Sequence, residues 1–246
     1  MTISRRINLH IHSKYSDGKN TIEEIVKGAI TADLEYIAIT DHFSNSWKSK
    51  IIPTLNSKEK IENYLDEIET VNSQLREVNE KLMVLKGIEI DLSSSHDYIS
   101  NLINPTDFDL ILFEYLESPE AISFSKNIIT NWKNSYKETQ IPLTGLAHFD
   151  PAFFIFNDME VFFSFMGQVR IFLEFNSSYS QYYSTKYTSF FQKIKERKIA
   201  VSIGCDSHNL SNIGDIEDPF TAIENYDLLD NLFTLLAGLD KKLKPF

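Results

Sequence analysis

Cysteine is almost absent from the sequence. Cys205 is the one cysteine in 246 residues, so the chain cannot form an internal disulfide. The chain also opens without a charged-then-apolar leader, and we therefore expect a cytoplasmic location. No apolar run approaches the ~18 residues that a bilayer-spanning helix needs, which argues against a membrane protein.

Glycine, proline and positive charge are also scarce. With 8 Gly and 7 Pro the chain is not of low complexity, and its 18 Phe and 11 Tyr supply a sizeable apolar core. The 24 Lys and Arg residues are outnumbered by 35 Asp and Glu, giving a net charge of -11, which argues against a general binder of nucleic-acid backbones. No linker divides the chain, so we expect a single domain over residues 1–246.

The first notable pattern is a pair of histidines near the start of the chain. Ile7, Leu9 and Ile11 alternate with Asn8, His10 and His12. In an extended strand both imidazoles therefore leave the backbone on one face. Two neutral imidazoles so placed can converge on one metal ion, although an exposed edge strand with two solvated histidines would give the same pattern.

Most other histidines also follow predicted strands and stand beside acidic residues. The segments concerned are Thr40-Asp41-His42, Ala147-His148-Phe149-Asp150 and Gly204-Cys205-Asp206-Ser207-His208. The segment Gly87-Ile88-Glu89-Ile90-Asp91 adds a pair of carboxylates in the same kind of position. Glu89 and Asp91 lie two residues apart, as do Asp206 and His208, so each pair shares one strand face. By the same parity Cys205 faces away, as a buried structural thiol. This inventory of imidazoles and carboxylates suffices for two or three metal ions.

Strand-like and helix-like segments alternate along the chain. After the first strand, we expect strands over Tyr36–Thr40, Met83–Asp91, Asp109–Leu116, Pro142–His148, Val169–Asn176 and Lys198–Asp206. Helices are expected over Thr21–Ala32, from Ser57 to Leu82, and over Pro119–Tyr136, Asp158–Met166, Ser184–Arg197 and Thr221–Leu239. The stripe after Ser57 suits an outer helix packed on a sheet, with a coiled coil as the alternative. Seven βα units predict an α/β fold whose parallel strands close into a barrel, with the site at their carboxyl ends.

The set and order of these motifs resemble the polymerase and histidinol phosphatase (PHP) superfamily of metal-dependent phosphoesterases. The resemblance runs from His10 to about Asp215 and is strongest to the small histidinol-phosphatase-like members. It implies a distorted (β/α)7 barrel of PHP type. It also implies which residues bind metal: His10, His12, Glu89 and Asp206 the first ion, Glu89 and His148 the second, and His42 and His208 the third, with Asp17 close to that third ion.

Other positions take their roles from the same resemblance. Asp41 and Asp91 are expected to orient histidines or accept their free N–H groups. Asn176 and Ser177, in the segment Glu174-Phe175-Asn176-Ser177, are expected to line the substrate pocket, although an ordinary strand-to-loop cap would look the same. His96 matches no motif position, and we expect a solvated loop histidine.

One position departs from the family pattern. Similar sequences carry a histidine at the end of the fourth strand, as a ligand of the second ion, where this chain has Leu116. Glu114 lies two residues earlier on the same face and is a candidate replacement ligand, with Glu117 a weaker one. Alternatively, Glu114 is a charged strand-end residue in water, and the second site is lost or completed by solvent.

These residues together predict a hydrolase. The resemblance implies that a small phosphomonoester is hydrolysed by attack of a metal-bound hydroxide, with Asp17, His42 or His208 helping to protonate the leaving group. Nitrogen and oxygen ligands without thiolate suit Zn²⁺, Mn²⁺ and Fe²⁺ alike. The alternatives are a phosphodiesterase or exonuclease acting on nucleotides or oligonucleotides, and a catalytically silent metal-binding module. The sequence does not indicate the oligomeric state.

Overall fold

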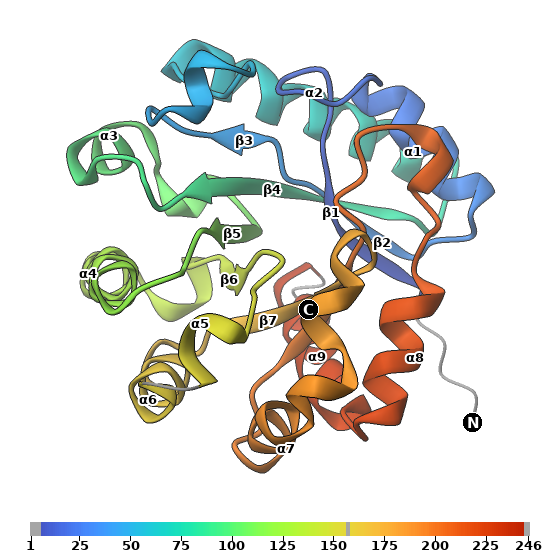
Figure 1. Ribbon diagram of the computed structural model, residues 1–246. Coiled ribbons are helices and arrows are strands. Elements are labelled where there is room, and N and C mark those ends of the chain that lie inside the picture. Colours follow the sequence, from blue (N-terminus) through green and yellow to red (C-terminus); the bar gives the residue numbers. More distant parts are fainter. Residues whose placement is uncertain (1–5, 156–157, 244–246) are drawn as a thin grey trace.

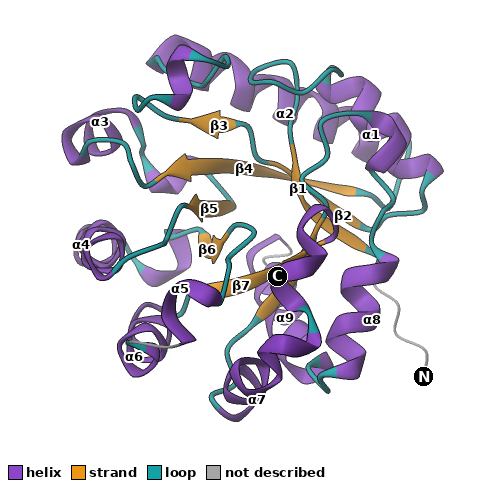
Figure 2. Cartoon of the chain, viewed as in Figure 1, coloured by secondary structure: helices purple, strands orange, loops and turns teal. Residues whose placement is uncertain are grey.

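The computed structural model describes residues 6–155 and 158–243 and shows a nearly closed parallel barrel surrounded by helices (Figure 1, Figure 2). Its long strands pair in the order β1-β2-β4-β5-β6-β7-β8. Their bounds are β1 Ile7–Ile11, β2 Tyr36–Ile39, β4 Met83–Asp91, β5 Leu110–Glu114, β6 Leu143–Leu146, β7 Phe172–Asn176 and β8 Val201–Gly204. The amide of His12 donates to Ser207 O at 2.9 Å, which joins the end of β1 to the segment after β8. The predicted seven-stranded barrel is thus confirmed.

The barrel is distorted on one side, where β4 has two different neighbours. The first half of β4 pairs with β2, whereas its second half pairs with β3 (His42–Phe43), with His42 opposite Glu89. This short strand is an addition to the strands that the sequence predicts. Gly87 lies at the change of partner, where a Cβ would stand 2.4 Å from Ile39 O. The register brings His42 beside Glu89, at the mouth of the barrel.

Several helices begin where the capping residues predict. Thr21 and Glu24 form a capping box at the start of α1 (Ile22–Thr31), and the Ser57 side chain accepts from the Lys60 amide at the start of α2 (Lys58–Glu77). Helix α2 buries its apolar stripe against the sheet, as expected of an outer helix. The other predicted helices correspond to α4 (Pro119–Ser135), α6 (Met159–Val169), α7 (Thr188–Glu196), α8 (Glu217–Asn225) and α9 (Leu229–Leu243).

Some predicted boundaries are wrong. Helix α2 ends at Glu77, so Val78 is exposed and Leu82 lies beyond the helix. Residues 221–239 form parts of two helices because Asp227 adopts a left-handed φ of 54° between them. Val169 ends α6 instead of starting a strand, since Arg170 is also left-handed, at φ 56°. His96 begins a short helix, α3 (His96–Leu102), that was not predicted, although its side chain is exposed as expected.

The core fills both the barrel and the layer between strands and helices. Phe149, Phe154, Phe162 and Phe190 form one ring cluster behind the carboxyl end of β6, where the four-residue helix α5 (Ala152–Ile155) begins. Burying an aromatic ring is among the larger contributions to core stability. This cluster fixes the loop that carries His148. Within the part of the chain that the structure describes, no helix is both long and apolar enough to span a bilayer.

Candidate metal centre

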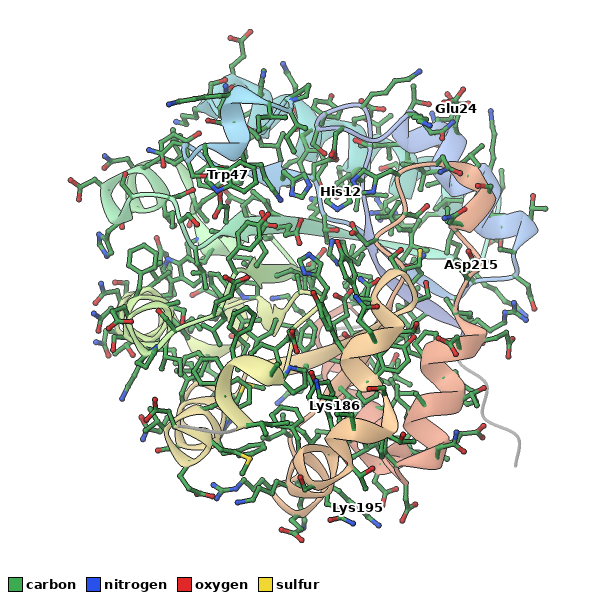
Figure 3. The ribbon with its side chains drawn as sticks, viewed as in Figure 1. His12, Glu24, Trp47, Lys186, Lys195 and Asp215 are labelled. Atoms are coloured by element: carbon green, nitrogen blue, oxygen red, sulfur yellow. The ribbon has the colours of Figure 1, made fainter. Side chains whose placement is uncertain are left out.

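The first predicted set of ligands converges at the carboxyl ends of β1, β4 and β8. His10 Nε2 and His12 Nε2 lie 3.1 Å apart. Glu89 Oε1 stands 3.3 Å from His10 Nε2, and Asp206 Oδ1 stands 2.9 Å from His12 Nε2. Four ligand atoms from three strands therefore surround one small space, and Figure 3 shows His12 beside β1 at this end of the barrel.

The hydrogen bonding of these carboxylates indicates that the space suits a cation. Both oxygens of Glu89 and Oδ1 of Asp206 are buried, yet none of them forms a hydrogen bond with any described residue. A buried carboxylate oxygen without a partner is costly, and a bound cation removes that cost. The residues present therefore fit the metal ion that the sequence implies.

A second group of ligand atoms lies next to the first. Asp17 Oδ1 stands 3.1 Å from His208 Nε2 and 3.6 Å from His42 Nε2. These atoms, with one from His12, all lie within 4.8 Å of one another. The turn after β1 thus brings Asp17 to the two histidines with which the sequence grouped it.

A third group contains Glu89, His42 and Glu114. His42 Nδ1 stands 2.7 Å from Glu89 Oε2 and 3.6 Å from Glu114 Oε1. His148 also approaches Glu89, with its Nε2 3.2 Å from Oε1. Glu114 is buried, so its interpretation as a strand-end residue in water is wrong. Glu117 is exposed, and Leu116 is buried.

These groups face a cavity of about 370 Å³. Its floor includes Asp17, His42, His148, Asp206 and His208. Its rim is aromatic and apolar, with Trp47, Ile51 and Phe153 exposed there and Tyr115, Tyr179 and Tyr182 beside them. Trp47 is labelled at this end of the barrel in Figure 3.

Comparison with known proteins identifies the family. A family model described as PHP domain matches residues 8–178. The chain belongs to the PHP family. The match holds six of the eight predicted metal ligands and confirms the resemblance, while Asp206 and His208 lie beyond it.

One curated relative and two solved structures are similar to this PHP domain. The DNA polymerase/3'-5' exonuclease PolX of Bacillus subtilis (strain 168) is 25% identical over 218 residues, which are 87% of this chain and 36% of PolX. The chain thus spans about a third of the length of that relative. Histidinol phosphate phosphatase (HISK) from Lactococcus lactis subsp. lactis Il1403, complexed with zinc, L-histidinol and phosphate, matches with a TM-score of 0.62 and 16% identity, over 90% of this chain and 94% of its own. YwqE from Bacillus subtilis and CpsB from Streptococcus pneumoniae, unique metal-dependent tyrosine phosphatases, provide a match with a TM-score of 0.51 and 16% identity, over 91% and 93% of the two chains.

Glu174 lies behind the candidate metal ligands of this PHP domain and contacts two of them, an arrangement that the sequence did not reveal. Its Oε1 lies 2.9 Å from His10 Nδ1, and its Oε2 accepts a hydrogen bond from the amide of His148 at 2.7 Å. A carboxylate in this position fixes the orientation of the imidazole and raises its basicity. Gly204 makes room for it, because a Cβ there would lie 1.9 Å from Glu174 Oε1. The available signal was the position of Glu174 on β7, two residues before Asn176.

The predicted pocket residues Asn176 and Ser177 lie at the end of β7 and just after it, and they do not line the cavity. Asn176 is buried, with its Nδ2 3.4 Å from His10 Nδ1 and its Oδ1 accepting from the Ser178 amide as a helix cap. Neither Asn176 nor Ser177 is among the described residues that line the 370 Å³ cavity. The cap interpretation of Asn176 is confirmed.

Asp41 and Asp91 hold loops instead of imidazoles. Asp41 accepts hydrogen bonds from the hydroxyl groups of Ser13 (2.6 Å) and Ser16 (2.5 Å), in the turn that carries Asp17. Asp91 accepts from Ser44 Oγ at 2.7 Å and from Ser46 Oγ, in the loop after β3. The printed hydrogen bonds of both carboxylates therefore differ from those we expected, since no described histidine donates to either.

Burial and charge act in opposite directions on the imidazoles. Burial disfavours the charged form of His42, but Glu89 and Glu114 outweigh it and raise the pKa of His42 to about 10. Burial, reinforced by the neighbouring His42, lowers the pKa of His12 to about 3. Burial opposes ionisation of Asp17, yet the hydrogen bond to His208 and the nearby imidazoles lower its pKa to about 2. These shifts give a neutral His12 close to an ionised Asp17.

Backbone conformation also shapes the centre. Tyr115, His148 and Asp206 have left-handed φ values of 63°, 32° and 50°, each just beyond a strand end. Such conformations are costly for residues other than glycine and concentrate at functional sites. They turn Tyr115, His148 and Asp206 into the lining of the cavity.

Proposed function

We propose that this PHP domain is a metal-dependent phosphoesterase that hydrolyses a small phosphomonoester. The observation that carries the proposal is the set of buried carboxylate oxygens on Glu89 and Asp206 that lack hydrogen bonds among the described residues while ring nitrogens face them. Such a set fits divalent cations, and the cavity above it has room for a small substrate.

The residues that would hold the ions fall into the groups already described. His10, His12, Glu89 and Asp206 would bind one ion, and Asp17, His42 and His208 another, with His148 adding a ligand beside Glu89. When bound, Zn²⁺, Mn²⁺ or Fe²⁺ would supply positive charge for phosphoryl oxygens and acidify a water molecule. Glu174 would keep the His10 ring oriented toward the ion by accepting a hydrogen bond from its Nδ1–H group.

Proton transfer is assigned to the exposed side of the floor. Asp17 and His208 line the cavity and contact each other at 3.1 Å, and both are partly exposed, whereas His10 and His12 are fully buried. A proton donor to a leaving group must lie within hydrogen-bond reach of it. Asp17, with a pKa of about 2, is ionised at neutral pH and can only orient a donor. We therefore propose that His208, oriented by Asp17, or His42, which also lines the cavity, protonates the leaving oxygen.

The rim supports a compact substrate with an apolar or aromatic part. Trp47, Ile51 and Phe153 are three exposed apolar side chains around one opening. Exposed apolar groups that gather at a cavity commonly mark a ligand site. The phosphatases of similar fold act on histidinol phosphate and on phosphotyrosine, which both carry a ring, and this supports an aryl phosphate as the first assay substrate.

The test is turnover together with metal content. The purified protein, stripped with a chelator and reloaded separately with Zn²⁺, Mn²⁺ or Fe²⁺, should hydrolyse an aryl phosphate only when loaded. Metal binding without turnover on any phosphoester would favour the silent module instead. The relative PolX supports a second candidate, cleavage of nucleic acid ends, and faster cleavage of a labelled oligonucleotide than of phosphomonoesters would favour it.

A further inference from the structure

Lys48 occupies an unusual place beside the proposed metal centre. It begins the 3-10 turn η1 (Lys48–Lys50) after β3, and it is the only lysine or arginine among the described residues that is buried. Buried ammonium groups are rare unless they are paired. Lys48 nevertheless reaches the lining of the 370 Å³ cavity, together with His42, Asp206 and His208.

The Lys48 ammonium group is held by Glu114. Lys48 Nζ donates to Glu114 Oε1 at 2.7 Å and to Oε2 at 2.5 Å. It stands 3.4 Å from His42 Nδ1 and 5.1 Å from the centre of the Tyr115 ring. Pairing with a buried carboxylate and packing on an aromatic face both fix the position of a lysine.

This pair lies close to the position where the chain departs from the expected pattern of metal ligands. The family resemblance implies a histidine ligand at position 116, two residues beyond the end of β5, and the buried side chain of Leu116 lines the cavity there without offering a ligand. Glu114 is the only replacement carboxylate on that face, but both of its oxygens already bind Lys48. A metal ion on Glu114 would share that carboxylate with an ammonium group, and two cations so close repel each other. The residues at this corner therefore do not fit a further metal ion.

We propose that Lys48, positioned by Glu114, binds the phosphoryl group of the substrate and takes the place of one metal ion. An ammonium group has three N–H donors and acts as a point charge toward phosphate oxygens. Two of these donors bind Glu114. The third has only a long contact of 3.4 Å with His42 Nδ1, which itself lies 2.7 Å from Glu89 Oε2, so it can turn to a phosphate oxygen in the cavity. The chain then uses two metal ions and one lysine to hold the phosphoryl oxygens. This inference rests on the proposed phosphoesterase function.

The experiment compares phosphate binding with metal content. Inorganic phosphate is titrated into metal-loaded protein by calorimetry and is also used as an inhibitor of aryl phosphate hydrolysis, while bound metal is counted by mass spectrometry. We expect about two equivalents of metal per chain in the unmodified protein and in Lys48→Gln. Lys48→Gln should bind phosphate at least about 10-fold more weakly, whereas Lys48→Arg, which keeps the charge, should stay within about 3-fold.

Two further variants keep the test decisive. Lys48→Gln leaves the buried Glu114 carboxylate unpaired, which can prevent folding. The double variant, Lys48→Gln with Glu114→Gln, removes both charges together. It should show the same loss of phosphate binding as Lys48→Gln. Glu114→Gln alone should keep the metal content, because Glu114 positions Lys48 and does not bind metal. Lys242→Gln, at a partly buried lysine that donates to Ile141 O, is the control and should bind phosphate normally.

Each outcome bears on one of the two proposals. Unchanged phosphate affinity in Lys48→Gln and in the double variant would overturn the role of Lys48. Loss of one metal equivalent in Glu114→Gln would overturn it as well, by making Glu114 a ligand. If the unmodified, metal-loaded protein neither binds phosphate nor hydrolyses any phosphoester, the proposed function fails whatever the variants do.

Discussion

The two sides of the barrel mouth place similar residues in opposite states. On the histidine side, formed by His10, His12, Glu89 and Asp206, carboxylate oxygens face ring nitrogens with no hydrogen bond between them. On the lysine side, formed by Lys48, Glu114 and Leu116, the carboxylate already has two short bonds to an ammonium group. Glu89 and Glu114 are both buried, so burial alone does not decide whether a site binds a cation.

The nearest partner of a buried carboxylate therefore determines whether that carboxylate is available to a metal ion. A charge taken out of water must be compensated nearby, either by the chain or by a bound ion. Lys48 compensates Glu114 with a cation of the chain itself. Around Glu89 and Asp206, imidazoles provide nitrogen ligands but only partial charge compensation, and this leaves room for a metal ion. Variants that change the residues of one side at a time test whether the two sides differ in this way.

The largest effect is expected from removing a carboxylate of the histidine side. Asp206→Ala should lower kcat/KM for an aryl phosphate by at least about 100-fold, above the ~10–100-fold typical of residues that only orient a ligand. It should also lose about one equivalent of metal, measured by mass spectrometry. Full metal content and full rate in Asp206→Ala would contradict the assignment of this residue. Asp97→Ala, at an exposed carboxylate on α3, is the matched control and should be unaffected.

A smaller loss is expected from the residue behind the histidine side. Glu174→Gln keeps the shape of the side chain but weakens the contact with His10 Nδ1, which lies 2.9 Å away. Metal affinity should fall by about 10–100-fold, as is typical when the partner of a metal-bound imidazole is changed. A titration with a competing chelator measures this affinity. Because the ligands themselves remain, excess metal should restore most of the rate, and failure of excess metal to do so would argue for a direct role in catalysis.

The histidine side was largely predictable from sequence, whereas the lysine side was not. Alternation of apolar and polar residues in β1 was enough to place His10 and His12 on one face, because strand periodicity is local. Lys48 lies 66 residues before Glu114 and 68 residues before Leu116, in a loop without periodicity, so nothing local links it to the site. Glu174 is likewise separated from His10 by 164 residues.

The prediction from strand alternation that Asp206 and His208 point to the same side agrees with their positions at the cavity. It assumed an extended backbone, but Asp206 has a left-handed φ of 50°. The turn at Asp206, together with the Ser207 bridge to β1, brings both side chains to the cavity. Backbone conformations of this kind depend on tertiary contacts, which a single sequence does not display.

A moderate effect on stability is expected when the histidine side has no metal. The folded pKa of His42 is raised to about 10, above its ordinary value of 6.5. Its contribution to stability is therefore complete below pH 6.5 and is lost as the pH rises through 10. One pKa unit corresponds to about 1.4 kcal/mol, and 1 kcal/mol moves the Tm of a chain this size by roughly 2–4 °C. The Tm of chelator-treated protein should thus fall by at least about 3 °C between pH 6.5 and 9.5.

Two further measurements separate the contribution of His42 to stability from that of the overall charge of the protein. His42→Gln should reduce the fall in Tm between these two pH values, measured by circular dichroism. Loading with metal should reduce it as well, because a metal ion competes with the proton for the same imidazole nitrogens. A Tm that rises with pH over this range in the metal-free protein would show that the His42 contribution has the wrong sign.

The smallest effect on activity is expected directly behind the histidine side, at Cys205. Its buried thiol accepts a hydrogen bond from Asn8 Nδ2 at 2.7 Å, and burial raises its pKa to about 12. Because the thiolate is the reactive form, labelling by a disulfide reagent at pH 8 should be at least about 100-fold slower in folded protein than in urea. Cys205→Ala should keep the metal content and hold kcat/KM within about twofold, since the side chain of a buried cysteine acts as a small apolar group. Rapid labelling of the folded protein would contradict the burial of the thiol. Loss of metal in the variant would show that Cys205 contributes to the metal centre.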